Sequence, residues 1–177
     1  MTTGSQGPPA FEAWVSVEGR ALKRAALALC GNEHEADELV QETLVRMFVR
    51  WARVSRMDNP AGYARRTLTN LRLSRWRRLR LELSTGNPRP VERVDEIGAV
   101  AERAAAASFL SALGPKQRAA VVWRYYCDLP IGEIAVILGC SEATVRSQLS
   151  RALSTLRRVA EAHTAQEVFT QRHEDRR

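Results

Sequence analysis

The chain has 177 residues, with 27 Lys and Arg against 20 Asp and Glu, a net charge of +7 and a pI of about 10.1. This length allows one domain or two small ones, and the positive charge favours nucleic acid as a partner without requiring it. No apolar run approaches a membrane span, and the N-terminal MTTGSQGPPA lacks the parts of a signal peptide, so we expect a cytoplasmic protein with no membrane insertion.

Apolar residues recur at helical spacing along most of the chain, which predicts an all-α fold. A first helix is expected from about residue 9 to residue 30, where Gly31-Asn32 forms a stop signal. Asn32 can cap a second helix, whose acidic first turn suits the helix dipole. The spacing predicts that the buried face of this second helix consists of Val40, Leu44, Met47, Phe48 and Trp51.

A polar loop over residues 53–59 precedes a third helix, with Asn59 as its cap and Pro60 in its first turn. Its predicted core stripe is Ala64, Leu68 and Leu71. Opposite this stripe project Arg66, Asn70 and Arg77, while one flank carries Arg65, Arg72 and Trp76. Leu73 falls among the outward residues, and helical spacing does not explain it.

The second half of the chain predicts a linker and a further helical unit. Residues 81–99, with the turn-forming STGNPRP, have no sustained apolar period and are typical of a linker. Helices are then expected from about 100 to 113, from 115 to 127, over 131–138 and from 142 to 160, followed by a frayed tail over 161–177. In the helix that begins at Pro115, the predicted core residues are Val121, Val122 and Tyr125.

Residues 131–150 have the layout of a helix-turn-helix: a short helix, a Gly139 turn, a Ser141 cap and a longer helix. The small hydroxyl groups near the start of the longer helix suit phosphate contacts, and the Arg and Gln that follow suit base edges in a major groove. The polar positions are Ser141, Thr144, Arg146, Ser147, Gln148 and Arg151. The alternative is an ordinary helical hairpin with a solvated arginine face.

Two runs of opposite charge lie close together in the first half. Residues 33–42 hold five carboxylates and no Lys or Arg, and residues 63–80 hold seven arginines and no acid. This contrast suggests two partners, one basic and one polyanionic. The alternatives are a solubilising acidic face and an arginine-rich helix that binds a membrane surface or RNA. Trp76 and Tyr63 can stack on bases of an exposed strand or serve as core aromatics.

The sequence offers no metal site, no cofactor site and no catalytic arrangement. Cys30, Cys127 and Cys140 form no CxxC pair or Cys/His cluster, which favours buried free thiols. A Ser/His/Asp spacing, a glycine-rich phosphate loop and an HExxH motif are all missing. We therefore expect a protein that is not an enzyme.

Three ordered segments resemble bacterial sigma factors: ADELVQETLVRMFVRW at 36–51, NPAGYARRTLTNLRLSRWRR at 59–78, and the segment 114–157, which contains the helix-turn-helix. The similarity covers about residues 11–160 and is to the small extracytoplasmic-function (ECF) class, within it the SigE-like actinobacterial branch. It implies sigma domain 2 over 9–80 and sigma domain 4 over 100–160, joined by a flexible linker over 81–99.

The resemblance also implies a role for each segment. The acidic helix would dock on the β′ clamp helices of RNA polymerase core through Asp37, Glu38, Gln41 and Glu42. The basic helix would engage the −10 element of promoter DNA through Asn59, Arg65, Arg66, Asn70, Arg72, Trp76 and Arg77. The helix-turn-helix would read the −35 element through Ser141, Thr144, Arg146, Ser147, Gln148 and Arg151. The polymerase β flap and an anti-sigma factor are further candidate partners.

The chain departs from the family pattern at Ser74, Pro130 and Gln148, and these changes affect the promoter sequence rather than the class. Two other functions remain open from the residues alone. One is a helix-turn-helix transcriptional regulator that is not a polymerase subunit, and the other is an adaptor that binds polymerase without reading DNA. Adjacent acidic and arginine-rich helices favour the sigma factor, because a sensor domain has no need of them.

Overall fold

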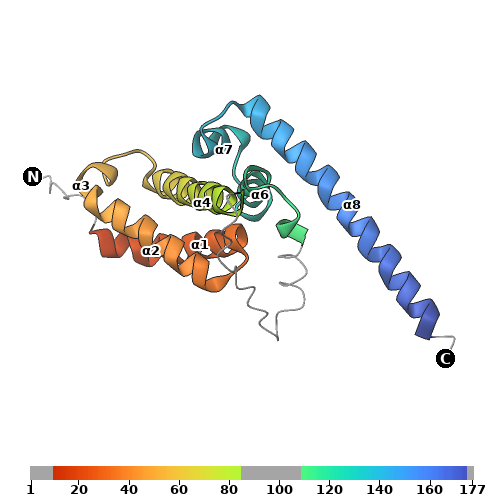
Figure 1. Cartoon of the computed structure of the whole chain (residues 1–177). Coiled ribbons are helices and arrows are strands. Elements are labelled where there is room, and N and C mark those ends of the chain that lie inside the picture. Colours follow the sequence, from red (N-terminus) through yellow and green to blue (C-terminus); the bar gives the residue numbers. More distant parts are fainter. Residues whose placement is uncertain (1–9, 85–108, 175–177) are drawn as a thin grey trace, which may run out of the picture.

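A computed structural model describes residues 10–84 and 109–174, and within these two ranges it contains helices and turns but no strand. The helices of the first range are α1 (Phe11–Cys30), α2 (Glu33–Val49), α3 (Trp51–Val54) and α4 (Pro60–Ser84). Those of the second range are α6 (Pro115–Val121), the π-helix η1 (Val122–Tyr126), α7 (Ile131–Leu138) and α8 (Glu142–Glu174) (Figure 1). The predicted all-α fold is confirmed.

Helices α1, α2 and α4 pack together as the first unit, and short polar signals set their ends. Helix α1 ends at Gly31, whose left-handed φ of 76° lets its N–H reach the Leu27 carbonyl at 2.7 Å. One residue on, the Asn32 side chain accepts a hydrogen bond from the Glu35 N–H at 2.9 Å and so caps α2. At the start of α4, Asn59 Oδ1 accepts from the Gly62 N–H at 2.7 Å. All three predicted helix ends are confirmed.

The buried face of α2 differs from the prediction. It consists of Ala36, Leu39, Thr43 and Met47, with Val40 and Leu44 half-buried beside it. The predicted Phe48 is wrong, because 60% of it is exposed. A sequence period cannot tell the inner residue from its neighbour one position away when both are apolar, and here Met47 is the inner one. Phe48 instead meets the Phe11 ring edge-on, at 5.3 Å between centroids.

Helix α4 buries the predicted stripe of Ala64, Leu68 and Leu71 against α1 and α2. It runs four residues further than expected, to Ser84, so the first four residues of the predicted linker are helical. The rest of that linker and most of the helix expected from residue 100 lie outside the described residues.

In the second unit, α6 continues into the π-helix η1, and this changes which aromatic residue is buried. Val121 and Val122 are in the core as predicted, but Tyr125 is 59% exposed and Trp123 is 1% exposed in its place. A π turn has a wider hydrogen-bond ring than an α turn, so residues after it rotate out of the phase that a 3.6-residue period gives. The prediction for Tyr125 is therefore wrong. The frayed tail is also corrected, since α8 continues to Glu174.

The two units pack against each other, with α4 lying against α7 and α6, and α1 against η1 (Figure 1). This contact explains Leu73, which is half-buried and lines a cavity together with Leu113 and Pro115 of the second unit. Leu73 points outward from the first unit alone and inward when both units are counted. Helix α8 leaves the body of the molecule and extends as far as Glu174 (Figure 1).

Candidate functional site

The carboxylates of α2 are mostly paired with cations of the same chain. Lys23 of α1 binds Asp37 and lies 3.5 Å from Glu33, and its hydrogen bond to Asp37 is the main reason that the pKa of Lys23 is raised. Arg72 of α4 lies 3.1 Å from Glu35. The two charge runs of the sequence are therefore partly each other's partners, because α2 packs directly on α4.

Arg75 of α4 joins the two central carboxylates of the acidic run. Its two terminal nitrogens lie 3.2 Å from Glu38 and 3.0 Å from Glu42, which is also 2.7 Å from Arg46. Burial favours the neutral acid, but the hydrogen bonds from Arg75 and Arg46 outweigh it, so the pKa of Glu42 is lowered. Gln41 is exposed beside them. The four predicted residues of this helix thus form one half-exposed surface, although three of them have partners within the chain.

The seven arginines of α4 divide into two groups. Arg65, Arg72 and Arg75 face other helices and pair with Glu133, with Glu35 and with Glu38 and Glu42. Arg66, Arg77, Arg78 and Arg80 are exposed, and among the described residues no carboxylate oxygen lies within 4.0 Å of their guanidinium nitrogens. The outward group is therefore available to an anion from outside.

The predicted DNA-facing residues of α4 divide in the same way. Arg66, Asn70 and Arg77 share the exposed side, and Asn59 is exposed although its side chain caps the helix. Arg65, Arg72 and Trp76 are half-buried. The guanidinium carbon of Arg80 lies over the Trp76 ring, 5.2 Å from its centroid, in a cation–π contact. The outward face of α4 is therefore more typical of a nucleic-acid-binding surface than its half-buried flank is.

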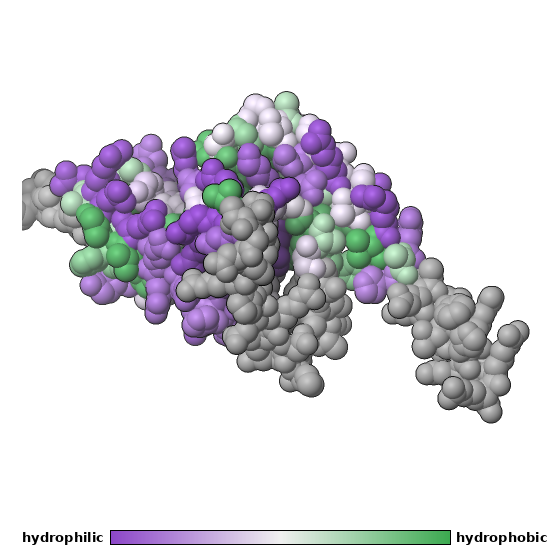
Figure 2. Space-filling view, viewed as in Figure 1, coloured by the Kyte–Doolittle hydropathy of each residue, from purple (hydrophilic) through white to green (hydrophobic). Residues whose placement is uncertain are grey.

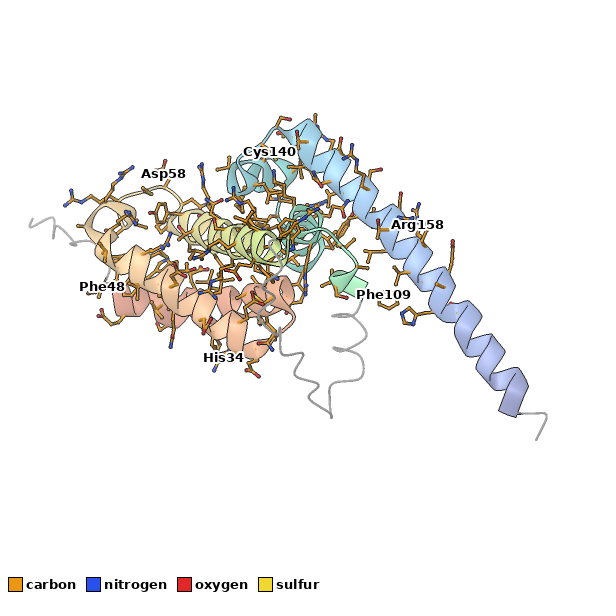
Figure 3. The ribbon with its side chains drawn as sticks, in the orientation of Figure 1. His34, Phe48, Asp58, Phe109, Cys140 and Arg158 are labelled. Atoms are coloured by element: carbon orange, nitrogen blue, oxygen red, sulfur yellow. The ribbon has the colours of Figure 1, made fainter. Side chains whose placement is uncertain are left out.

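The helix-turn-helix has the predicted geometry. Gly139 turns the chain with a φ of 63°, and Ser141 Oγ accepts a hydrogen bond from the Thr144 N–H at 3.2 Å. Cys140, which lies between Gly139 and Ser141, marks this turn in Figure 3. Val145, Leu149 and Ala152 of α8 are buried. The opposite face is open to solvent and carries Thr144, Arg146, Ser147 and Arg151, with Gln148 half-buried. Arg146 is held by Glu142 at 2.6 Å, whereas Arg151 has no carboxylate within 4.0 Å among the described residues.

An apolar patch next to the acidic surface was not predicted from the sequence. Val45, Phe48 and Val49 at the end of α2 are 62%, 60% and 75% exposed. Figure 3 labels Phe48 near the end of the molecule at which Figure 2, in the same view, shows an apolar area. Phe48 was assigned to the core because its spacing fits a buried stripe. The sequence signal for such a patch is an apolar stripe on the helix that is wider than the face buried in the core.

Other kinds of site find no support in the described ranges. No group of three or more His, Cys, Asp and Glu side chains there is arranged to hold a metal ion. The Cys30 thiol is buried, and burial with the nearby Glu35 charge raises its pKa to about 12, so it stays protonated at neutral pH. None of the helices in the same ranges is both long and apolar enough to cross a membrane.

A helix-turn-helix, a second helix with an arginine face and an acidic helix with exposed apolar neighbours define a helical DNA-binding protein that also has a surface for a protein partner. Family comparison identifies the particular family. The Sigma-70 region 2 model matches residues 10–82 and the Sigma-70 region 4 model matches residues 103–156. The chain belongs to the sigma-70 family of RNA polymerase sigma factors, as the sequence resemblance predicted.

Similar proteins place it among the ECF sigma factors: the ECF RNA polymerase sigma factor SigE of Mycolicibacterium smegmatis is 32% identical over 93% of this chain and 67% of its own. It is 34% identical to the RNA polymerase sigma-E factor of Streptomyces avermitilis over 94% of both chains. The sigma-E factor of Streptomyces coelicolor is 35% identical over 83% of this chain and 84% of its own. Among solved structures, the sigma factor RpoE in complex with the anti-sigma factor NepR from Bartonella quintana has the same fold, with a TM-score of 0.72 and 22% identity over 85% of this chain and 96% of that one. The alternative of a regulator outside polymerase is not favoured.

Proposed function

We propose that three separate surfaces of this sigma factor carry out its three tasks. The acidic surface of α2 binds polymerase core, the outward face of α4 binds the −10 element, and the exposed face at the start of α8 reads the −35 element. The observation that carries this proposal is the division of the α4 arginines, because only the outward group lacks carboxylate partners among the described residues.

The α4 surface combines charge with a hydrogen-bonding side chain. Arg66 and Arg77 supply guanidinium groups for phosphates, and Asn70 between them supplies an amide that can pair with a base edge. Unpaired bases expose edges that a duplex hides, so this face suits an opened strand. Arg65 and Arg72 support the surface from behind through their ion pairs, and reach DNA only if those pairs break.

The surface on α2 offers carboxylates, an amide and apolar side chains along one helix. Glu38, Gln41 and Glu42 lead along the helix to the exposed Val45 and Phe48. A basic partner helix with an apolar stripe fits such a surface, because charge sets the register and the apolar area gives affinity. Since two solved structures of the same fold contain an anti-sigma factor or the cytosolic domain of a second protein, an anti-sigma partner is a further candidate for this chain.

The test of the α2 surface is binding to purified core polymerase. Glu38→Gln combined with Gln41→Ala removes one charge and one amide without placing a new charge next to Arg75. We expect core affinity to fall about tenfold or more, while helicity stays normal. The matched control is Glu33→Gln, which removes a carboxylate of the same helix outside the surface. Equal affinity of the double variant and the control would refute the assignment.

The test of the α4 surface separates opening of the promoter DNA from the first binding of the holoenzyme to it. Asn70→Ala should lower permanganate reactivity of unpaired thymines more than it lowers initial binding, on a promoter that the wild-type holoenzyme opens. A template already mismatched over the −10 region should restore part of the loss. If opening is normal and only the first binding step weakens, this helix is a duplex anchor instead.

A further inference from the structure

One cavity of the molecule has a positively charged lining that the three proposed surfaces do not use. It has a volume of about 140 Å³ and lies where α4 and the end of α1 meet α6. Arg72 of α4 and Arg118 of α6 line it, together with the apolar Leu29, Leu73 and Leu113. Since a water molecule takes up about 30 Å³, the cavity has room for about four waters or for one small ion.

Arg118 is a buried cation with incomplete hydrogen bonding. It is 9% exposed, and its Nε donates to the Ala28 carbonyl at 3.0 Å. Among the described residues neither of its two terminal nitrogens has a hydrogen-bond acceptor, and no carboxylate oxygen lies within 4.0 Å of them. Burial and then the charge of Arg72 lower the pKa of Arg118, although a guanidinium stays charged at neutral pH. An anion with several acceptor atoms would reduce the cost of burying this charge.

The groups around the cavity leave positive charge in excess. Arg72 donates from its Nε to the Leu29 carbonyl at 3.2 Å, and its Nη1 lies 3.1 Å from Glu35. The end of α1 contributes about half a negative charge, because its last carbonyls accept from both guanidinium groups. Two arginines against one carboxylate and this partial charge leave an excess of about half a positive charge.

We propose that this cavity binds one tetrahedral oxyanion, a phosphate or a sulfate, between the guanidinium groups of Arg72 and Arg118. Such an anion has acceptor oxygens on several sides, and guanidinium groups bind these oxygens through charge-assisted hydrogen bonds. The phosphate is either free in solution or the terminal group of a nucleotide, since both present the same oxygens. The inference does not rest on the proposed roles of the α2, α4 and α8 surfaces.

The test is thermal unfolding of the full chain at pH 7 in rising concentrations of inorganic phosphate. Potassium chloride at the same ionic strength is the reference, because exposed arginines respond to salt in general. We expect a saturable rise in Tm above the chloride reference, of about 4 °C when phosphate is at about ten times its Kd. Sulfate should act in the same way, and calorimetry should give one site per chain. A rise no larger than that in chloride would overturn the proposal.

The first pair of variants tests the guanidinium of α6. Arg118→Gln removes the charge and keeps an N–H donor for the Ala28 carbonyl. The matched control is Arg124→Gln, because Arg124 bonds to Leu129 and Asp128 within its own unit. Phosphate affinity should fall at least tenfold in Arg118→Gln and stay unchanged in Arg124→Gln. Equal phosphate affinities in the two variants would overturn the assignment.

A second pair of variants decides the matter if Arg118→Gln does not fold. Ser111 is exposed and lines the cavity, whereas its neighbour Ala112 is exposed and does not line it. Ser111→Glu adds a carboxylate that competes with phosphate, so it should raise the Tm in chloride and weaken phosphate binding at least threefold. Ala112→Glu should do neither. Equal phosphate affinities in these two variants, with normal circular dichroism in both, would overturn the proposal.

The same titration with ATP distinguishes the two sources of the anion. An affinity at least tenfold higher than that of inorganic phosphate, lost in Arg118→Gln, identifies the terminal phosphate of a nucleotide as the ligand. An affinity equal to or below that of inorganic phosphate identifies free phosphate. ATP binding that is the same in wild type and in Arg118→Gln excludes a nucleotide from this cavity, and inorganic phosphate then remains the ligand.

Discussion

Replacing Arg75 by Gln should lower stability and at the same time strengthen polymerase binding. Arg75 is 22% exposed and bridges Glu38 and Glu42, whose side chains are 53% and 35% exposed. Ion pairs this open to solvent are each worth about 0.2–1 kcal/mol. Losing both should lower the free energy of unfolding by about 1 kcal/mol and the Tm by about 3 °C.

The same change should act in the opposite direction on core binding. In the free chain Arg75 competes with a basic partner for the two carboxylates, and an uncharged glutamine side chain would not compete. If about 1 kcal/mol of attraction is released to the partner, affinity rises about fivefold. The effect should shrink as salt is raised, because the carboxylates are partly exposed.

The assay is a titration of labelled chain with core polymerase at low and moderate salt, beside thermal unfolding. Arg78→Gln is the control, because Arg78 is exposed on the same helix and has no carboxylate within 4.0 Å among the described residues. If Arg75→Gln weakens core binding as much as the loss of Glu38 does, Arg75 positions these carboxylates for polymerase, and the competition argument is wrong.

Three further predictions concern pH, turns and DNA reading. The folded pKa of Glu42 is lowered, so its carboxylate stabilises the fold above the ordinary carboxyl range near pH 4.3 and loses this effect as pH falls through the folded pKa. Glu42→Gln should therefore lower the Tm at pH 7, and the difference from wild type should shrink as the pH is lowered below this range. In unfolding titrations Gly139→Ala should lower the free energy of unfolding by about 1–2 kcal/mol, because alanine is strained in the left-handed conformation. Gly31→Ala should lower it more, because a Cβ at Gly31 also meets a neighbouring side chain, whereas a Cβ at Gly139 meets none. In gel-shift assays Arg151→Ala should weaken the binding free energy by about 1–3 kcal/mol on a specific −35 duplex and by less on a scrambled one. Arg146→Ala should weaken binding less than Arg151→Ala, because Arg146 must first leave the Glu142 carboxylate to reach DNA. Equal losses on the two duplexes would refute base reading.

Local signals were sufficient for the helices and their ends. Gly31, Asn32, Asn59 and Ser141 form caps or turns with their own neighbours, so the sequence alone contains the needed information. The helix-turn-helix was predictable for the same reason. Its turn residues and its buried and open faces lie within one short segment.

Contacts between distant segments were not predictable in this way. The position of Leu73 depends on the second unit, which packs against it and which helical spacing within α4 does not reveal. Trp123 rather than Tyr125 is buried because the π turn shifts the phase of the helix. The sequence also assigned Arg72 to DNA, but no periodicity shows that Glu35 lies 3.1 Å away across the α2–α4 contact. Charge patterns give the faces of a helix, and only packing decides which charges are already paired.

The most direct test of the account is transcription of fragmented genomic DNA from the source organism by its purified core polymerase, with and without this chain, followed by sequencing of the RNA 5′ ends. The account predicts a set of start sites that appears only when the chain is added and that shares two upstream sequence elements. It also predicts that the Glu38→Gln, Gln41→Ala variant loses the whole set, and that Arg151→Ala changes the preference at the upstream element alone. The same start sites with and without the chain would contradict it.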